Sequence, residues 1–202
     1  MKTLKYFAML FLLVCFTACS SDDNSSKSSN NHFTYKGKTY ELKAGIIEKD
    51  GTDWSDDGSM EYYLTLVTSN LSFDADNDIW PTENLFSLIN FNLYSKNKNH
   101  PNTGTYKINE EYNVDYTIED AMVVLDINWV EGEDELVGTF LFITSGNVKL
   151  HKTGNTYKMD FEFTTHTNEI IKGHYDGKLI AYDYDEGQAR PEVRSLFQKK
   201  LQ

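Results

Sequence analysis

The chain of 202 residues has little cysteine and little proline, and each shortage carries information about the fold. Its two cysteines, Cys15 and Cys19, both lie near the start. A disulfide-stabilised scaffold needs cysteines throughout the folded domain, so this domain depends on its apolar core. The three prolines, Pro81, Pro101 and Pro191, lie outside the segments that alternate apolar and polar residues. Those segments are therefore free to form strands.

Positive charge is also scarce. The sequence has 31 Asp and Glu against 19 Lys and Arg, and its formal net charge is −12. Nucleic-acid binding requires clustered cations that neutralise phosphates, so we expect no nucleic-acid partner.

Long apolar runs are missing as well. The uncharged run Tyr6–Phe16 has 11 residues, whereas a membrane-spanning helix needs roughly 20. Lys2 and Lys5 precede the run and small residues follow it, which is typical of a secretory signal peptide.

The end of this run, Phe16–Cys19 (FTAC), resembles the lipobox of bacterial lipoproteins. In that family the cysteine thiol receives diacylglycerol and the leader is cleaved before it. The resemblance implies that residues 1–18 are a signal peptide and that Cys19 anchors the mature chain to a membrane. The alternative is an ordinary secretory signal with an unused cysteine.

A polar tether follows the anchor. Ser20–Asn31 contains no apolar residue, so it cannot bury enough surface to offset chain entropy. We expect residues 19–31 to be a lipidated cysteine and a disordered tether of at most about 40 Å. Asp22 and Asp23 resemble the surface-export signal of Bacteroidetes-type lipoproteins. This implies the outer face of the outer membrane, with the periplasm-facing leaflet as the alternative.

Residues 32–202 have the length of one domain and the periodicity of strands. In Thr156–Thr164, for example, Tyr157, Met159, Phe161 and Phe163 share one face. Similar segments are Glu61–Thr68, Leu85–Ser95, Ala121–Val130, Gly138–Lys152, Ile170–Tyr184 and, as a hairpin, His32–Lys49. Regularly spaced strands with turn residues between them predict an all-β fold. We expect an antiparallel β-sandwich, with a lipocalin-like barrel as the alternative.

One helix is predicted at the C-terminus. Arg190–Gln202 begins with a proline at its second position and places four apolar residues on one side. These residues are Val193, Leu196, Phe197 and Leu201. We expect a short amphipathic helix that caps the sandwich.

A longer stretch, Thr144–Leu179, resembles a hairpin block of Bacteroidetes surface lipoproteins. Its features are Ser-Gly, a short strand, a Gly-Asn turn, a strand led by tyrosine, and a final Gly-x-Tyr-x-Gly. Phe33–Leu42 and Asn102–Ile108 are similar to the start and middle of the same families. The resemblance implies a β-sandwich or calycin-like domain of unassigned function, and it transfers no catalytic residues.

Motifs for catalysis are not present in the sequence. It contains no Gly-x-Ser-x-Gly, no His-Glu-x-x-His and no phosphate-binding glycine loop. The five histidines show no metal-ligand spacing. We therefore expect a binding protein, with a hydrolase whose site is not recognisable as an alternative.

Three aspartates form a candidate calcium site. Asp74, Asp76 and Asp78 stand at alternate positions, as in calcium-binding loops. An EF-hand would continue with Gly and Glu where Ile79 and Leu85 stand, so this is not an EF-hand. The two interpretations are a looser Ca²⁺ site and a solvated acidic loop.

Tryptophan provides the last clue. Trp54 and Trp80 lie in acidic loops, whereas Trp129 lies in a predicted strand and is expected in the core. A loop tryptophan can stack on a sugar, anchor a partner or cover the end of a sandwich. If all strands alternate in direction, Trp54 and Trp80 lie at opposite ends, and residues 131–136 return to the Trp54 end. The candidate ligand surface is then Trp54, Asp53, Asp56, Glu133 and Glu135, with His100 and His166 on the same side.

These observations favour a lipid-anchored cell-envelope protein that captures a glycan or a protein at the cell surface. A lipocalin-like carrier of a small apolar ligand is the alternative, and it would need an internal cavity of about 300 Å³ or more.

The anchor generates the first testable prediction. Cells that express the wild-type chain should incorporate a labelled fatty-acid analogue into it, because the Cys19 thiol accepts the lipid. The Cys19→Ser variant should incorporate none, while Cys15→Ser should match the wild type. Equal labelling of wild type and Cys19→Ser would contradict the assignment.

Overall fold

The computed structural model describes residues 30–49, 55, 57–73, 79–109, 114–129 and 137–183. Within these ranges all regular elements are β-strands, and no helix is long and apolar enough to cross a membrane. The predicted all-β class is thus confirmed, while the predicted helix Arg190–Gln202 lies outside the described residues. The strands are β1 (His32–Tyr35), β2 (Lys38–Glu41), β3 (Ala44–Lys49), β4 (Met60–Val67), β5 (Leu71–Phe73), β6 (Ile79–Pro81), β7 (Leu85–Ser95), β8 (Gly104–Ile108), β9 (Thr117–Asn128), β10 (Val137–Thr153), β11 (Thr156–Thr165), β12 (Ile170–Lys178) and β13 (Ile180–Asp183).

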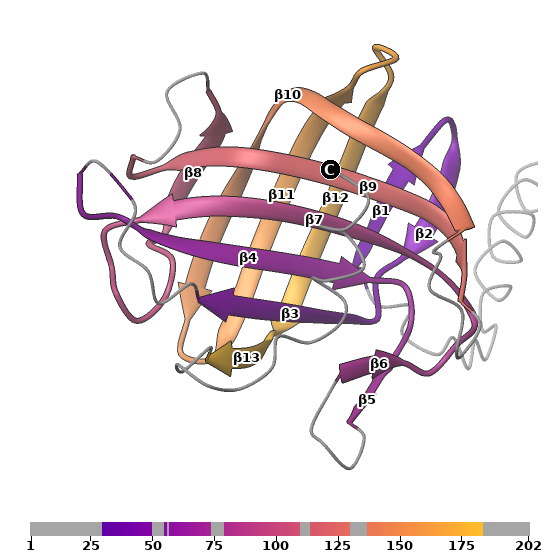
Figure 1. The fold of residues 1–202 in the computed structure, drawn as a ribbon, viewed down its shortest axis with the longest axis horizontal. Helices are drawn as coiled ribbons and strands as arrows, with labels where there is room; N and C mark the ends of the chain where they lie inside the picture. Colours follow the sequence, from indigo (N-terminus) through magenta and orange to yellow (C-terminus); the bar gives the residue numbers. More distant parts are fainter. Residues whose placement is uncertain are drawn as a thin grey trace, which may run out of the picture.

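One sheet forms most of the domain. It contains eleven strands in the order β13-β3-β4-β7-β9-β8-β10-β11-β12-β1-β2, and β5 and β6 form a separate hairpin. The sheet curls into a half-barrel, in which β3, β4, β7 and β9 form a front layer (Figure 1). Behind it β11, β12 and β1 cross in a back layer (Figure 1). The architecture therefore shares features with both the sandwich and the barrel that the sequence predicts.

The long strand β10 connects the two layers. Its first part, Val137–Phe142, pairs with β9 of the front layer. Its later part pairs with β8 and β11, with a register shift between Ile143 and Ser145. Such a bulge bends a strand and increases its twist. The bend lets one strand belong to both layers and turns the sheet around its own core.

Gly146 lies at this bend with a φ of 143°. A Cβ at this position would overlap the carbonyl oxygen of Glu162 and lie 2.7 Å from Cδ1 of Phe163. Both the backbone conformation and the close approach of β11 therefore require glycine.

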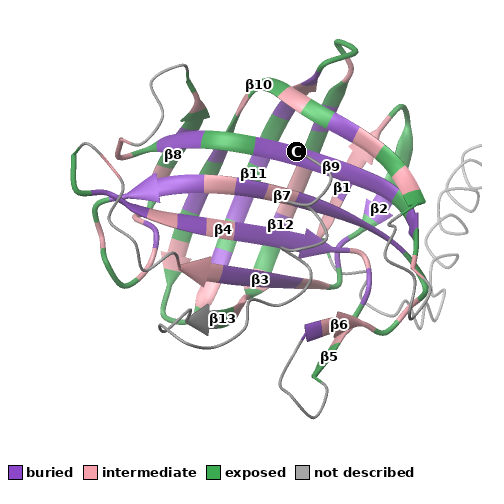
Figure 2. Ribbon diagram, viewed as in Figure 1, coloured by how far each residue is buried: buried purple, intermediate pink, exposed green. Residues whose placement is uncertain are grey.

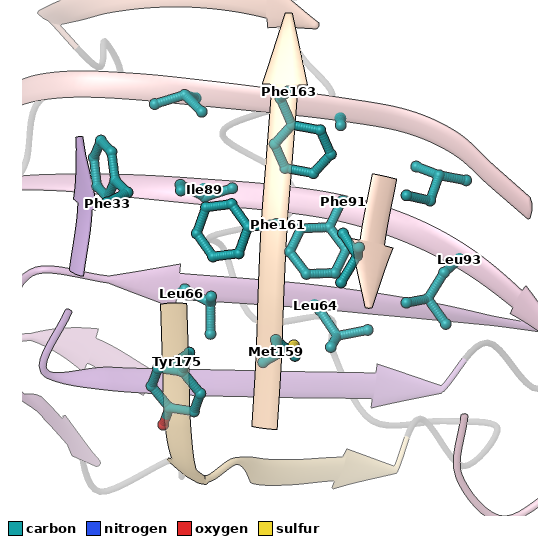
Figure 3. Close-up of a cluster of buried hydrophobic side chains, with 14 of the residues drawn as sticks. Phe33, Leu64, Leu66, Ile89, Phe91, Leu93, Met159, Phe161, Phe163 and Tyr175 are labelled. Atoms are coloured by element: carbon teal, nitrogen blue, oxygen red, sulfur yellow. The ribbon is translucent and has the colours of Figure 1, made fainter. Parts of the chain in front are cut away.

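The core lies between the layers and follows the alternation of the strands. Met159, Phe161 and Phe163 of β11 face inward, and they meet Leu64 of β4 and Phe91 of β7 (Figure 3). The rings of Phe91 and Phe163 lie 6.1 Å apart, which joins the front layer to the back layer. Figure 2 shows the alternation of buried and exposed residues along β11, as the sequence predicts for a half-buried strand.

Short connections close the sheet at both of its edges. Lys36 and Gly37 both have positive φ, 48° and 77°, and form the two-residue turn between β1 and β2. Between β12 and β13, Leu179 lies over Gly45 of β3, where a Cβ would overlap its side chain. β13 then pairs with β3 in parallel.

The entry of the chain is fixed at Asn31. Its side-chain oxygen accepts a hydrogen bond from the N–H of Asp176 at 2.7 Å, and its amide donates to the carbonyl of Asp176 at 3.2 Å. Its own carbonyl accepts from the N–H of Leu42 at 2.9 Å. The last residue of the predicted tether therefore belongs to the folded domain.

One expectation about strand direction is wrong. Strand β8 runs parallel to β9, with Lys107 opposite Thr117 and Ile108 opposite Ile118. Successive connections therefore do not alternate between the two ends after β8. The antiparallel pattern cannot reveal this, because β8 is short and pairs mainly with β10, a strand that follows it later in the chain.

The bend generates the second prediction. Gly146→Ala should lower the free energy of unfolding by at least about 2 kcal/mol, because the new Cβ meets backbone and the φ is strained. Urea denaturation followed by tryptophan fluorescence measures this. Gly154→Asn is the control, since Gly154 has a φ of 56° and open space around it, so asparagine should cost below about 1 kcal/mol. Equal losses in both variants would contradict the role of Gly146.

Candidate functional site

The site residues predicted from the sequence lie outside the described residues. They are Cys19, Asp53, Trp54, Asp56, Asp74, Asp76, Asp78, Glu133 and Glu135. Only the strand ends that flank them can be compared.

Those strand ends do not support the predicted grouping of residues 131–136 with Trp54. Met60, the first residue of β4, lies opposite Ser95 at the end of β7. Asn128, the last residue of β9, lies opposite Leu85 at the start of β7. The alternation that the grouping requires does not hold, because β8 and β9 are parallel.

The two histidines expected on the same side lie apart. The N–H of His166 donates to the carbonyl of Phe142 at 2.8 Å. The loop that holds His100 leads to Thr103, whose hydroxyl accepts from the N–H of Lys152 at 3.1 Å. About 30 Å of strand separates Phe142 from Lys152 along β10, so this prediction is wrong.

The structure instead brings together two tryptophans that are distant in sequence. Trp80 lies in β6 and Trp129 directly follows β9, and their ring centroids are 5.3 Å apart with a tilt of 31°. The N–H of Trp129 donates to the carbonyl of Asn84 at 2.8 Å. Both side chains are half-buried. The predictions of a loop at Trp80 and a core position for Trp129 are therefore both corrected.

Trp129 of this pair packs on a second apolar cluster, on the outer side of the front layer. Trp129 and Phe140 pack against it, together with Leu71 of β5. Its buried members are Val67, Phe86, Leu88, Met122, Val124 and Ile127. Trp129 therefore covers the edge of a cluster rather than entering the main core.

The β5–β6 hairpin is attached to the sheet through Ser69. Its hydroxyl oxygen accepts the N–H groups of Thr82 at 3.0 Å and Glu83 at 3.1 Å, and its hydroxyl donates to the carbonyl of Asn70 at 2.7 Å. These bonds hold both strands of the hairpin and thereby place Trp80 beside Trp129.

An ion pair adds a second attachment. The ammonium group of Lys43 lies 2.8 Å from Oε1 of Glu83. The pKa of Glu83 is lowered, mainly by the hydrogen bond from Lys43. Partial burial raises this pKa and opposes the effect, while a hydrogen bond with Ser69 lowers it further. Lys43 also donates its backbone N–H to the carbonyl of Val67, so the pair connects the hairpin to the sheet.

Exposed apolar residues lie at strand positions next to the tryptophans. Within the described residues, Phe73, Leu85 and Val137 are 55%, 64% and 61% exposed. Leu85 and Val137 both lie opposite Asn128, which precedes Trp129, and Phe73 lies opposite Ile79, which precedes Trp80. The three residues therefore share the rim with the tryptophans, with side chains on the alternate face of each strand. We call these five residues, Trp80, Trp129, Phe73, Leu85 and Val137, the tryptophan corner.

A polar cluster marks the opposite end of the front layer. Asp57 accepts hydrogen bonds from the N–H groups of Ser59 at 3.0 Å and Asp115 at 3.3 Å, and Lys96 lies 3.5 Å from it. Burial raises the pKa of Asp57, but the hydrogen bonds and Lys96 outweigh burial and lower it. Asp115 also accepts the N–H of Lys96 at 3.0 Å. The cluster therefore links the loops that contain Asp57, Lys96 and Asp115, and its role is structural.

The back layer carries two pairs of polar side chains on its outer face. Nδ1 of His174 lies 2.6 Å from Asp160, and Lys172 lies 3.0 Å from Glu162. In the part of the chain that the structure describes, no group of three His, Cys, Asp or Glu side chains is placed to hold a metal ion.

No protein-family model matches this chain, and no curated protein and no solved structure matches it. The interpretation of the tryptophan corner therefore depends on its residues and geometry.

The ion pair generates the third prediction. Lys43→Ala should raise the pKa of Glu83 toward its ordinary value of 4.5, because its main stabilising partner is lost. A carboxyl group whose pKa is lower in the folded chain than in the unfolded chain stabilises the fold at every pH above the unfolded-state pKa. This stabilisation is lost as the pH falls through the folded-state pKa. The variant should therefore lose less than about 1 kcal/mol at pH 7, since both groups are partly exposed, and the difference should shrink below pH 4.

Carboxyl carbon NMR of Glu83 during an acid titration measures this pKa, with Lys149→Ala on the back layer as the control. An unchanged titration of Glu83 in Lys43→Ala would show that the pair does not form.

Proposed function

We propose that this protein is a lipid-anchored cell-envelope binding protein and that the tryptophan corner is its binding surface. The observation that carries the proposal is the contact between two half-buried tryptophans at a rim where three exposed apolar residues also lie. A tryptophan offers a large rigid ring and a polar N–H, and tryptophans are enriched where partners bind most strongly. Exposed large apolar side chains near one another are also typical of interaction sites.

A protein partner is favoured over a glycan. Phe73, Leu85 and Val137 add apolar area that a hydroxyl-rich ligand would not use. The ion pair Lys43–Glu83 supplies a polar rim beside the apolar centre, which is the usual anatomy of a protein interface. A glycan is the second candidate, because a sugar ring could stack on Trp80 or Trp129.

We expect the ligand to bind outside the half-barrel, because side chains fill its interior. The rings of Phe91, Phe161 and Phe163 meet between the layers (Figure 3). A carrier of an apolar ligand would have to displace these side chains. With the lipid anchor expected at Cys19, the domain would offer this rim to partners at the outer face of the outer membrane.

The fourth prediction compares two exposed apolar residues. Leu85→Asp should weaken binding at least about tenfold, because it replaces an exposed apolar side chain of the rim next to Trp129 by a charge. Ile170→Asp is the matched control, since Ile170 is also an exposed apolar residue but lies at the start of β12. It should leave binding unchanged. Both variants should keep the fold, because exposed positions tolerate substitution within about 0.5 kcal/mol.

The measurement uses a displayed peptide library and a glycan array, each probed with wild type and both variants. Peptide hits lost in Leu85→Asp alone would support a protein partner, and glycan hits lost in the same way would transfer the proposal to a sugar. Hits that survive Leu85→Asp would exclude the corner as the binding surface.

A further inference from the structure

The outer side of the front layer is buried although none of the strands in the described part of the chain lies over it. Ile46, Leu88, Met122 and Val124 face away from the main core, because their neighbours along each strand belong to that core. Met122 is nevertheless only 6% exposed, and the other three side chains are at most 4% exposed. Figure 1 shows no strand in front of β4, β7 and β9, and Figure 2 shows buried residues along them. An outer face this apolar and this buried has a cover.

The tryptophan corner accounts for only one end of this face. Leu71, Trp129 and Phe140 pack against the cluster that includes Leu88 and Val124. The next row along the strands runs across four of them. It consists of Ile46, Thr65, Asn90 and Met122, which lie opposite one another in register. This second row is farther from the corner and is still largely buried at Ile46, Thr65 and Met122.

A buried acceptor on the same face points to a polar partner. Among the described residues, Oδ1 of Asn92 is buried and has no hydrogen-bond partner. Asn92 follows Asn90 on the same side of β7 and lies opposite Tyr63. An unsatisfied buried oxygen costs about 1–3 kcal/mol, so the cover is expected to bring a donor as well as apolar side chains.

We propose that the C-terminal segment of this chain, residues 184–202, docks on this outer face and covers it. The described chain ends at Asp183, which lies opposite Lys49 of β3, directly beside the face. The 19 residues that follow include the amphipathic stretch Arg190–Gln202. Its apolar side consists of Val193, Leu196, Phe197 and Leu201. As a helix this stretch would be about 20 Å long, and three strand spacings from β3 to β9 measure about 14 Å.

Charge and hydrogen bonding agree with the same occupant. The stretch Arg190–Gln202 carries Arg190, Arg194, Lys199 and Lys200 against one acid, Glu192, while Asp185 and Glu186 precede it. Glu48, Glu61 and Glu119 lie on the front layer around the apolar rows, so the face is acidic where this stretch is basic. An arginine also supplies donors of the kind that Oδ1 of Asn92 lacks. The shorter internal stretches outside the described residues are polar and offer no comparable apolar side.

A thiol-accessibility experiment tests the proposal in the full-length chain. Cys15→Ser and Cys19→Ser leave no thiol, and Met122→Cys then places one under the segment. Maleimide labelling of this thiol should accelerate at least tenfold when the chain ends at Ala189. In the full-length chain, Leu196→Asp should accelerate it similarly, while Gln198→Asp, which adds the same charge off the apolar side, should not.

Phe142→Cys is the control for reactivity. Phe142 lies opposite Met122 in register and is 45% exposed, so its thiol should label rapidly in every background. Circular dichroism of each variant establishes that the sheet is intact, and Leu196→Asp keeps the test decisive if the truncated chain does not fold. Protection of the Met122→Cys thiol that survives both the truncation and Leu196→Asp would overturn the proposal. Protection that disappears when the protein is diluted would also overturn it, because a second copy of the chain would then be the cover.

Discussion

The fold depends on one strand that serves two layers. β10 leaves β9 near Phe142 and joins β8 and β11 beyond the bulge at Ile143, so a single sheet faces itself. That geometry allows rings from opposite layers, such as Phe91 and Phe163, to pack in one core. It also requires close backbone approaches, and glycine occupies them at Gly146 and at Gly173, where a Cβ would overlap the ring of Phe161.

The same curl explains why the tryptophan corner is exposed. The back layer crosses the front layer instead of covering its full length (Figure 1). The ends of β7, β9 and β10 at Leu85, Asn128 and Val137 are therefore left at the rim. The β5–β6 hairpin, held by Ser69 and by the ion pair Lys43–Glu83, brings Trp80 to this rim. Apolar side chains there are available to a partner without disturbing the core.

The sequence was sufficient to predict the long strands and insufficient to predict the short β5–β6 hairpin and the site. Alternation in Thr156–Thr164 and the turn residues Lys36 and Gly37 act locally, so the half-buried β11 and the β1–β2 hairpin follow from the sequence. The bend near Gly146 is also suggested by a glycine within an apolar run. These features depend on neighbours in sequence or on the periodicity of one strand.

The pairing of Trp80 with Trp129 depends instead on contacts between distant segments. It requires Ser69 to hold the β5–β6 hairpin and Asn84 to accept the N–H of Trp129. No periodicity encodes such bonds. The parallel pairing of β8 with β9 is likewise set by tertiary structure, and it invalidates any count of strand directions. A tryptophan beside a proline in a short polar segment, as at Trp80 and Pro81, was the one available signal.

The bonds of Asn31 have a mechanical consequence. Its three hydrogen bonds reach Asp176 of β12 and Leu42 after β2, which are the strand next to β1 and the end of the β1–β2 hairpin. A pulling force on the preceding residues is therefore shared between two strands before it loads the first pair of β1, His32 and His174. A force along the chain before Asn31 would have to break these bonds together rather than one after another, so this edge of the sheet resists peeling.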